Sequence, residues 1–307
     1  MKRFLRQLLF FLSPVLLLGA ISEYLLRAIP NDYKLKKAYL DAHASQIQVL
    51  CLGNSHAYYG INPRYLSLPS YNASHISQSV NLDLKLFDKY RDRFSQLHYL
   101  LLPVSYASFT LNLENSEESW RIKNYALYYG IKPDRADLSN YSEMLANKLD
   151  INLLRLSSYY LQGKPEITSD ETGFGTNYSS SIKIDLESDG ITAARRHTAK
   201  DFRDLPLLRQ ALQELLDECG QRHVRVILFM PPAYVSYRDH LNQAQLDTVL
   251  NTVTHLVQTH DRVTFRDYLA DPSFTASDFY DADHLNERGA RKLTLLLDSL
   301  VRAPATP

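Results

Sequence analysis

The sequence predicts an α/β protein in which helices cover both faces of a parallel sheet. Short apolar runs bounded by glycine or proline are typical of buried strands. They alternate along the chain with longer segments whose apolar residues recur at helical spacing. Strands and helices that alternate in this way form parallel sheets. The 307 residues, 45% hydrophobic and 22% charged, allow one large domain or two small ones.

The periodic segments define a folded domain over residues 45–303 with an insertion at about 107–200. The predicted strands are residues 47–53, 97–106, 223–232 and 262–268. The predicted helices are residues 76–94, 205–220, 241–259 and 286–301. Between 107 and 200 the pattern weakens and tyrosines cluster, and the polar stretch 163–181 is predicted to be a long loop.

The N-terminus carries an export signal. Lys2, Arg3 and Arg6 precede an uncharged run over residues 8–21, which matches the basic and apolar regions of a signal segment. The run is shorter than the roughly 20 residues of a confident membrane span. However, bulky residues occupy the positions where a signal would be cleaved. We therefore predict an uncleaved signal anchor over 1–29, with its basic end in the cytoplasm. The alternatives are a cleaved signal, which gives a secreted protein, and a buried amphipathic helix.

Charge and cysteine content exclude several classes of protein. With 34 acidic and 34 basic residues the net charge is zero, so no basic field would attract nucleic acid. Two cysteines, Cys51 and Cys219, cannot form a disulfide framework. The histidines show no spacing typical of metal ligands, and we predict neither a metal nor a cofactor.

Two short motifs at opposite ends of the chain suggest a catalytic site. Ser55 follows the first predicted strand, and His284 precedes the last predicted helix. Chemistry in parallel sheets collects at the carboxyl ends of the strands, so the fold can bring both residues together. A serine nucleophile needs a base, and the base needs an orienting group. Asp281 is placed to orient His284, whereas Asp283 is predicted to point away. The N–H of Ser55 could help to hold an oxyanion.

These motifs carry a resemblance to a known family. Residues 52–56 (LGNSH), followed by Asp281-x-x-His284-Leu285, resemble the first and last blocks of the SGNH (GDSL-type) hydrolase superfamily. Residues 60–63 (GINP) and 281–290 (DADHLNERGA) resemble more closely its membrane-anchored bacterial branch, which is linked to acyl modification of cell-surface polysaccharides. The resemblance implies a three-layer flavodoxin-like sandwich, with Ser55 as nucleophile, His284 as base and Asp281 as orienting residue.

The oxyanion hole departs from the pattern of that superfamily. Its second block supplies a glycine N–H, but the corresponding residues 71–74 contain no glycine. Its third block supplies an asparagine amide, where this chain has Ser105, whose hydroxyl can also donate. The candidate donors are therefore Ser55, Asn72, Ser74 and Ser105.

Simpler interpretations accompany these motifs. Gly-Asn-Ser is common turn chemistry, and residues 281–286 could merely cap a helix. His56 is expected to support the site or to lie on the surface. Residues 195–197 (RRH) could bind an anionic group, but we expect them to be a solvated loop. The aromatic residues of the insertion could line a glycan groove, but we expect them to form its core. These residues are Trp120, Tyr125, Tyr128, Tyr129, Tyr159 and Tyr160.

Two functions follow. The first is a serine-dependent esterase or O-acyltransferase that acts on an acylated extracytoplasmic polysaccharide and is anchored by a single pass in the bacterial cell membrane. The second is a non-catalytic accessory protein that binds a glycan or a membrane acyltransferase partner.

Overall fold

The structure is a computed structural model that describes residues 1–303, and its chain forms two compact units. The N-terminal unit comprises Met1–Lys37 and Glu117–Ile167. The sheet unit comprises Ala38–Ser116 and the chain from Thr168 onward. The N-terminal unit thus joins the helix predicted over 1–29 to the central part of the predicted insertion.

The sheet unit is built on five parallel strands in the order β2-β1-β3-β4-β5. The strands are β1 (Val49–Cys51), β2 (Ser70–Asn72), β3 (Tyr99–Pro103), β4 (Arg225–Met230) and β5 (Val263–Asp267). This order is the doubly wound arrangement of flavodoxin-like folds. The α/β class expected from the sequence and the flavodoxin-like sandwich that the resemblance implies are confirmed.

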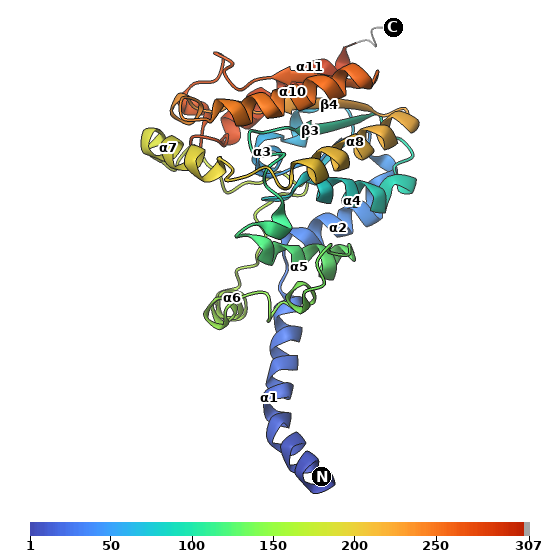
Figure 1. The fold of residues 1–307 in the computed structure, drawn as a ribbon, viewed down its shortest axis with the longest axis vertical. Coiled ribbons are helices and arrows are strands. Elements are labelled where there is room, and N and C mark those ends of the chain that lie inside the picture. Colours follow the sequence, from blue (N-terminus) through green and yellow to red (C-terminus); the bar gives the residue numbers. More distant parts are fainter. Residues whose placement is uncertain (304–307) are drawn as a thin grey trace. The chain divides into compact units, whose positions relative to one another are not determined.

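Helices cover both faces of this sheet (Figure 1). On one face, α3 and α11 bury Ala57, Leu293 and Leu297 against Val49 and Leu101 of the strands. On the other face, α4 packs against α8. The helices of the unit are α3 (Ser55–Gly60), α4 (Val80–Tyr90), α7 (Leu186–His197), α8 (Leu205–Gln221), α9 (Val235–Arg238), α10 (Gln243–Thr259) and α11 (Glu287–Arg302). Helix α2 (Asp32–His43) begins in the N-terminal unit and ends in the sheet unit.

The four predicted strands are present, but several elements escaped prediction, among them β2, α2 and α7. Strand β2 has only three residues, Ser-Tyr-Asn, which offer no apolar run. Helix α2 has a largely polar sequence, and α7 contains Gly190 in its interior. Gly190 weakens helical propensity but allows close contact, because a Cβ there would lie 2.1 Å from Ser236 Oγ of α9. As predicted, no helix or named strand is found between residues 163 and 185.

A glycine turn joins the first strand to the helix that carries Ser55. Gly53 has a φ of 114°, a left-handed conformation that glycine adopts readily. A Cβ there would lie 2.6 Å from the Pro103 ring at the end of β3. The Gly53 N–H donates to buried Asp83 Oδ1 at 2.7 Å. Burial raises the pKa of Asp83 to about 8, although hydrogen bonds from Gln78 and Gly53 oppose this shift.

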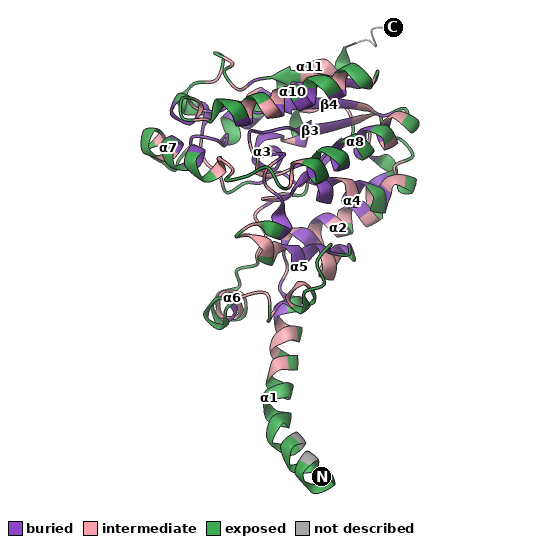
Figure 2. Cartoon of the chain, in the orientation of Figure 1, coloured by how far each residue is buried: buried purple, intermediate pink, exposed green. Residues whose placement is uncertain are grey.

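The N-terminal unit contains a long exposed helix and a small aromatic core. Its helices are α1 (Lys2–Ala28), α5 (Ile122–Asn124), the π-helical turn Tyr125–Tyr129 and α6 (Leu149–Gln162). Helix α1 is long and apolar enough to cross a membrane, a test that a signal sequence would also pass. Figure 2 shows most of α1 as exposed.

The aromatic residues of the insertion divide between core and surface. Tyr125 and Tyr129 are buried and pack edge-on against Tyr33, as expected for a core. Trp120 and Tyr160 are exposed. Beside this core, buried Glu143 forms ion pairs with Lys123 at 2.9 Å and with Arg155 at 2.8 Å.

The glycine turn gives a test of how the fold positions Ser55. We expect Gly53→Ala to lower the free energy of unfolding by about 1–3 kcal/mol, because the left-handed φ and the contact with Pro103 both oppose a side chain. Gly220→Ala in α8 is the matched control, since a Cβ there meets nothing within 4 Å, and it should be neutral or stabilising. Denaturant unfolding followed by circular dichroism measures both. Equal stability of the two variants would contradict the assigned strain.

Candidate active site

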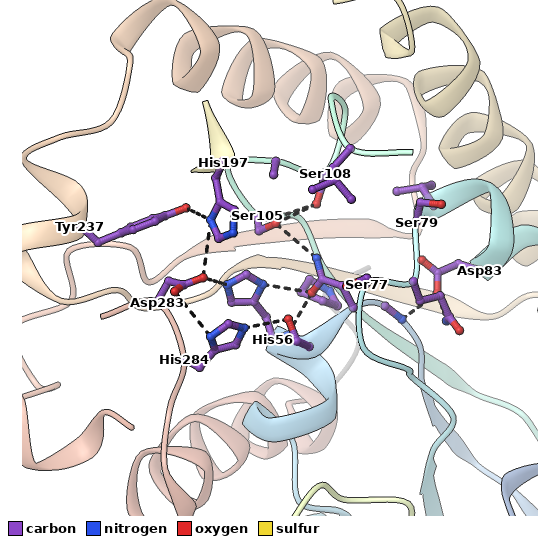
Figure 3. Close-up of a pocket in the computed structure, with 18 residues that line it drawn as sticks. His56, Ser77, Ser79, Asp83, Ser105, Ser108, His197, Tyr237, Asp283 and His284 are labelled. Atoms are coloured by element: carbon purple, nitrogen blue, oxygen red, sulfur yellow. Dashed lines mark hydrogen bonds and ion pairs between the residues drawn. The ribbon is translucent and has the colours of Figure 1, made fainter. Parts of the chain in front are cut away.

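The structure brings together the three side chains of the predicted triad. Figure 3 shows one of them, His284, at the wall of the adjoining cavity. His284 Nε2 lies 2.8 Å from Ser55 Oγ. On the other side of the ring, His284 Nδ1 lies 2.9 and 3.1 Å from the two carboxylate oxygens of Asp281. Because an ionised carboxylate can only accept, Nδ1 carries the proton when the ring is neutral, and Nε2 of that neutral ring can accept from the Ser55 hydroxyl. This is the geometry that a serine nucleophile requires.

Local capping places Ser55 at the first turn of α3. Asn54 caps this helix, with its Oδ1 accepting the His56 N–H at 3.0 Å. The Asn54 carbonyl accepts the N–H groups of Ala57 and Tyr58. These bonds satisfy the N–H groups that follow Ser55, so the Ser55 N–H is the donor that the start of the helix offers to the site.

A tight loop before α11 returns His284 to the same edge of the sheet. Tyr280 N–H donates to the His284 carbonyl at 3.0 Å and closes this loop. Asp281 Oδ1 accepts the N–H groups of Asp283 and His284, at 3.2 and 2.7 Å. Asn286 then caps α11. Asp281 therefore shapes the loop and also holds the imidazole ring.

Electrostatics favour an ion pair between His284 and Asp281. Burial alone would lower the pKa of His284, but the carboxylates of Asp281 and Asp283 outweigh it and raise the pKa to about 9. Burial would raise the pKa of Asp281, but the imidazole of His284 and its hydrogen bonds lower it to about 2. The site thus stabilises a positive charge on His284, the charge that the ring acquires when it takes a proton from serine.

Asp283 does not point away, and that prediction was wrong. Its side chain is 1% exposed, with Oδ1 3.5 Å from His284 Nδ1. Its Oδ2 lies 3.6 Å from His197 Nδ1 and 3.8 Å from His56 Nε2. Neither oxygen has a hydrogen-bond partner within residues 1–303. Burial raises the pKa of Asp283 to about 6, against the opposing effect of His284.

Two more histidines complete the surroundings of Asp283. The His56 ring stacks on His284, with centroids 4.9 Å apart, and its Nδ1 lies 3.1 Å from Asn54 Oδ1. His56 therefore supports the ring of His284, in keeping with one of the two roles expected for it. Burial lowers the pKa of both His56 and His197, the latter to about 3.

His197 was expected in a solvated loop, and this expectation was wrong. It ends α7, and its Nδ1 lies 2.9 Å from the Tyr237 hydroxyl of α9. The close contact between α7 and α9 at Gly190 brings His197 to the site. No spacing in the sequence reveals this contact.

The oxyanion candidates separate into two groups. Ser105 reaches the cavity beside Ser55, whereas Asn72 and Ser74 do not line it. Asn72 Nδ2 donates to the carbonyls of Ala57 and Ile61, both at 2.8 Å, and its Oδ1 accepts the Ser74 hydroxyl. The assignment of Asn72 and Ser74 as oxyanion donors is therefore corrected. Asn72 instead holds the carbonyl groups at the end of α3, and Ser74 bonds to Asn72.

Asn54 is a donor that the sequence analysis overlooked. Its Oδ1 faces His56, so its amide nitrogen faces Ser105 Oγ at 3.4 Å. The Ser108 hydroxyl accepts the Ser105 N–H at 2.8 Å and lies 3.2 Å from Ser105 Oγ. Either hydroxyl can be the donor in the contact between the two serines. When Ser108 donates, Ser105 Oγ accepts from both Asn54 and Ser108, and its own proton can be donated into the cavity. Asn54, Ser105 and the Ser55 N–H form the candidate oxyanion hole.

A small cavity adjoins Ser55. It measures about 80 Å³, and its lining includes the small side chains of Ser77, Ser79, Ala107 and Ser108 together with the larger His197 and Tyr237. For comparison, an apolar cavity of about 150 Å³ can hold one benzene molecule. Ser77 has a φ of 59°, an uncommon conformation for a serine, so backbone strain lies at the wall of this cavity.

Two groups of side chains could hold a metal ion, and the first includes His284, the candidate base. His56, Asp283 and His284 each offer a donor atom within 4.8 Å of the others, as do Asp189, Asp281 and Asp283. A cation held by the first group would occupy a nitrogen of His284 that contacts either Ser55 or Asp281.

The position of Asp283 predicts a shift in pH dependence. Reaction at Ser55 requires neutral His284, so its rate should rise as pH increases through the pKa of that ring. Asp283→Asn removes a negative charge 3.5 Å from Nδ1. The pKa of His284 should therefore fall, and the rise in rate should move to lower pH. The measurement is the rate of fluorophosphonate labelling at Ser55 against pH.

Asp281→Asn is the matched control for this substitution. It should lower the labelling rate by about 10³–10⁴-fold, because the ring loses the acceptor that fixes its tautomer. An Asp283→Asn profile that coincides with that of the unmodified protein would show that Asp283 does not influence the base.

Comparisons with known proteins yield structural likeness alone. No protein-family model matches the chain, and no curated protein matches it. Among solved structures, a Streptococcus pneumonia protein assigned as a platelet activating factor is 10% identical, with a TM-score of 0.45, over 94% of this chain and 99% of that one. A GDSL-like lipase from Bacteroides thetaiotaomicron is 10% identical, with a TM-score of 0.42, over 89% and 100%. A Bacteroides fragilis protein assigned as an acylhydrolase is 11% identical, with a TM-score of 0.38, over 86% and 94%. At TM-scores below 0.5 these likenesses carry no argument.

Proposed function

We propose that this protein is a serine-dependent esterase or O-acyltransferase. The observation that carries the proposal is the 2.8 Å contact between Ser55 Oγ and His284 Nε2, with Asp281 on the far side of the ring. Ser55 Oγ attacks the carbonyl carbon of an ester while His284 takes the hydroxyl proton. The carbonyl oxygen becomes an oxyanion. The backbone N–H of Ser55, the hydroxyl of Ser105 and the side-chain amide of Asn54 stabilise it.

The second half of the reaction returns the proton. His284 donates it to the leaving alcohol, and the acyl group remains on Ser55 as an ester. Water or a sugar hydroxyl then attacks this acyl-enzyme, again with its proton passing to His284, and Ser55 is released. Attack by water gives hydrolysis, and attack by a sugar hydroxyl gives acyl transfer.

The proposed substrate is an acylated polysaccharide outside the cytoplasmic membrane. Support comes from the resemblance of residues 52–63 and 281–290 to the membrane-anchored branch of the SGNH superfamily. Support also comes from α1, whose exposed apolar surface and basic N-terminal end suit a single-pass anchor. The sheet unit would then face the periplasm or cell surface.

A second candidate is a non-catalytic accessory protein that binds a glycan or a membrane acyltransferase partner. The observation that favours it is the oxyanion hole, from which Asn72 and Ser74 are withdrawn by other hydrogen bonds. The remaining side-chain donors, Ser105 and Asn54, lie 3.4 Å apart and already contact each other.

Covalent labelling separates the two functions. A fluorophosphonate probe should label the full-length protein, because it reacts with a serine that a nearby base activates. We expect Ser55→Ala to abolish labelling and His284→Ala to lower its rate by at least 10³-fold. Ser299→Ala, an exposed serine on α11, is the control and should label normally.

Two outcomes would count against the enzyme. Absence of labelling in folded protein would favour the accessory function. Labelling that persists in Ser55→Ala would assign the nucleophile to another residue.

A further assay distinguishes hydrolysis from transfer once labelling is established. It compares the release of free acid from a model ester with transfer of the acyl group to an added glycan.

A further inference from the structure

Helix α6 of the N-terminal unit exposes an apolar face. Leu149, Leu153, Leu154, Tyr160 and Leu161 are all exposed, with Leu154 at 63% and Leu161 at 83%. At 100° per residue these five side chains lie within one broad sector of the helix. Asp150 is the one charged side chain in that sector. Figure 2 shows much of α6 as exposed. A face of this kind marks a site of association.

The opposite side of α6 is held by polar contacts. Buried Asn152 donates to the Met144 carbonyl at 2.9 Å. Arg155 pairs with Glu143 at 2.8 Å and with Glu166 at 2.6 Å. The helix is therefore fixed in the unit, and its apolar face is presented in one direction.

These contacts place α6 beside the last turns of α1. The Tyr160 hydroxyl donates to the Leu25 carbonyl at 3.1 Å. The Glu23 carboxylate accepts the N–H groups of Glu143 and Met144, at 3.0 and 2.8 Å. Glu23 is the first charged residue after Arg6, so it marks the end of the uncharged part of α1. In Figure 1, α6 is seen nearly end-on, so its axis runs across that of α1.

We propose that α6 lies in the membrane interface, with its leucine face inserted among the lipid headgroups and upper acyl chains of the bilayer that α1 crosses. This inference rests on the anchoring role of α1 in the proposed function. An apolar helix that crosses a membrane-spanning helix at the end of its uncharged run lies at the depth where amphipathic helices bind lipid.

Charges at the two ends of α6 favour a lipid surface over a protein partner. Lys148 precedes the helix and Lys164 follows it, and both are exposed. They lie at the two ends of α6, where they would pair with lipid phosphates if the helix rests among the headgroups. The apolar face is also continuous with the exposed surface of α1, through the contact between Tyr160 and Leu25.

Fluorescence quenching by nitroxide lipids tests the placement on the full-length protein. An environment-sensitive fluorophore is attached to Leu16→Cys in α1, Leu154→Cys in α6 or Gln221→Cys in α8, each in a separate variant. The native Cys51 and Cys219 are buried, and burial raises the pKa of Cys219 to about 12, so labelling is confined to the new cysteine. The vesicles contain phosphatidylglycerol and phosphatidylethanolamine.

Three patterns are distinguishable. We expect strong quenching of position 16 by nitroxides deep in the acyl chains, strong quenching of position 154 by nitroxides near the headgroups, and little quenching of position 221. If position 16 is quenched while position 154 behaves like position 221, the interfacial placement of α6 is refuted and the anchor stands. If position 16 is not quenched, the anchor itself fails.

A protein partner would give a different result. Position 154 would then be shielded from aqueous iodide yet remain unquenched by nitroxide lipids, which would overturn the lipid assignment.

A double variant, Leu154→Ser with Leu161→Ser, provides a second check. This double variant should weaken quenching at a fluorophore on Leu153→Cys, relative to the same fluorophore without the serine substitutions, and leave position 16 unchanged.

Discussion

The contact between Ser55 and His284 depends on the meeting of two chain segments separated by 229 residues. Parallel strands end at one edge of a sheet, and the doubly wound order places β1 inside the sheet, between β2 and β3. Gly53 then turns the chain sharply into α3, while the loop closed by Tyr280 and His284 brings the imidazole back. Each feature is local, but only the whole sheet makes the two groups neighbours.

Much of this site can be predicted from the sequence because its reactive side chains lie in two short motifs. Ser55, Asp281 and His284 lie within segments bounded by clear strand and helix signals, and all three meet as expected. Strand β2 was missed because its three residues, Ser-Tyr-Asn, pair with β1 but contain no apolar run. His197 was missed because its place is set by the packing of α7 on α9, a contact between segments that no periodicity encodes.

Asp283 shows how burial changes the chemistry expected from sequence. Its neighbour Asp281 receives two backbone N–H groups and the imidazole of His284, and it stays ionised. Asp283 receives no such donor in the described chain, so desolvation raises its pKa. Two carboxylates two residues apart thus have opposite pKa shifts. Environments that push the pKa values of neighbouring acids apart are typical of functional sites.

Chemical rescue tests the central claim, that His284 is the base that activates Ser55. Glycine in place of His284 should leave a folded protein with a gap where the imidazole stood, and acylation of Ser55 by an activated ester should nearly cease. Imidazole added to the solution should restore it, with saturation and with a pH dependence that follows free imidazole. Folded His284→Gly protein that acylates Ser55 as fast as the unmodified chain, or that imidazole does not rescue, would contradict the account.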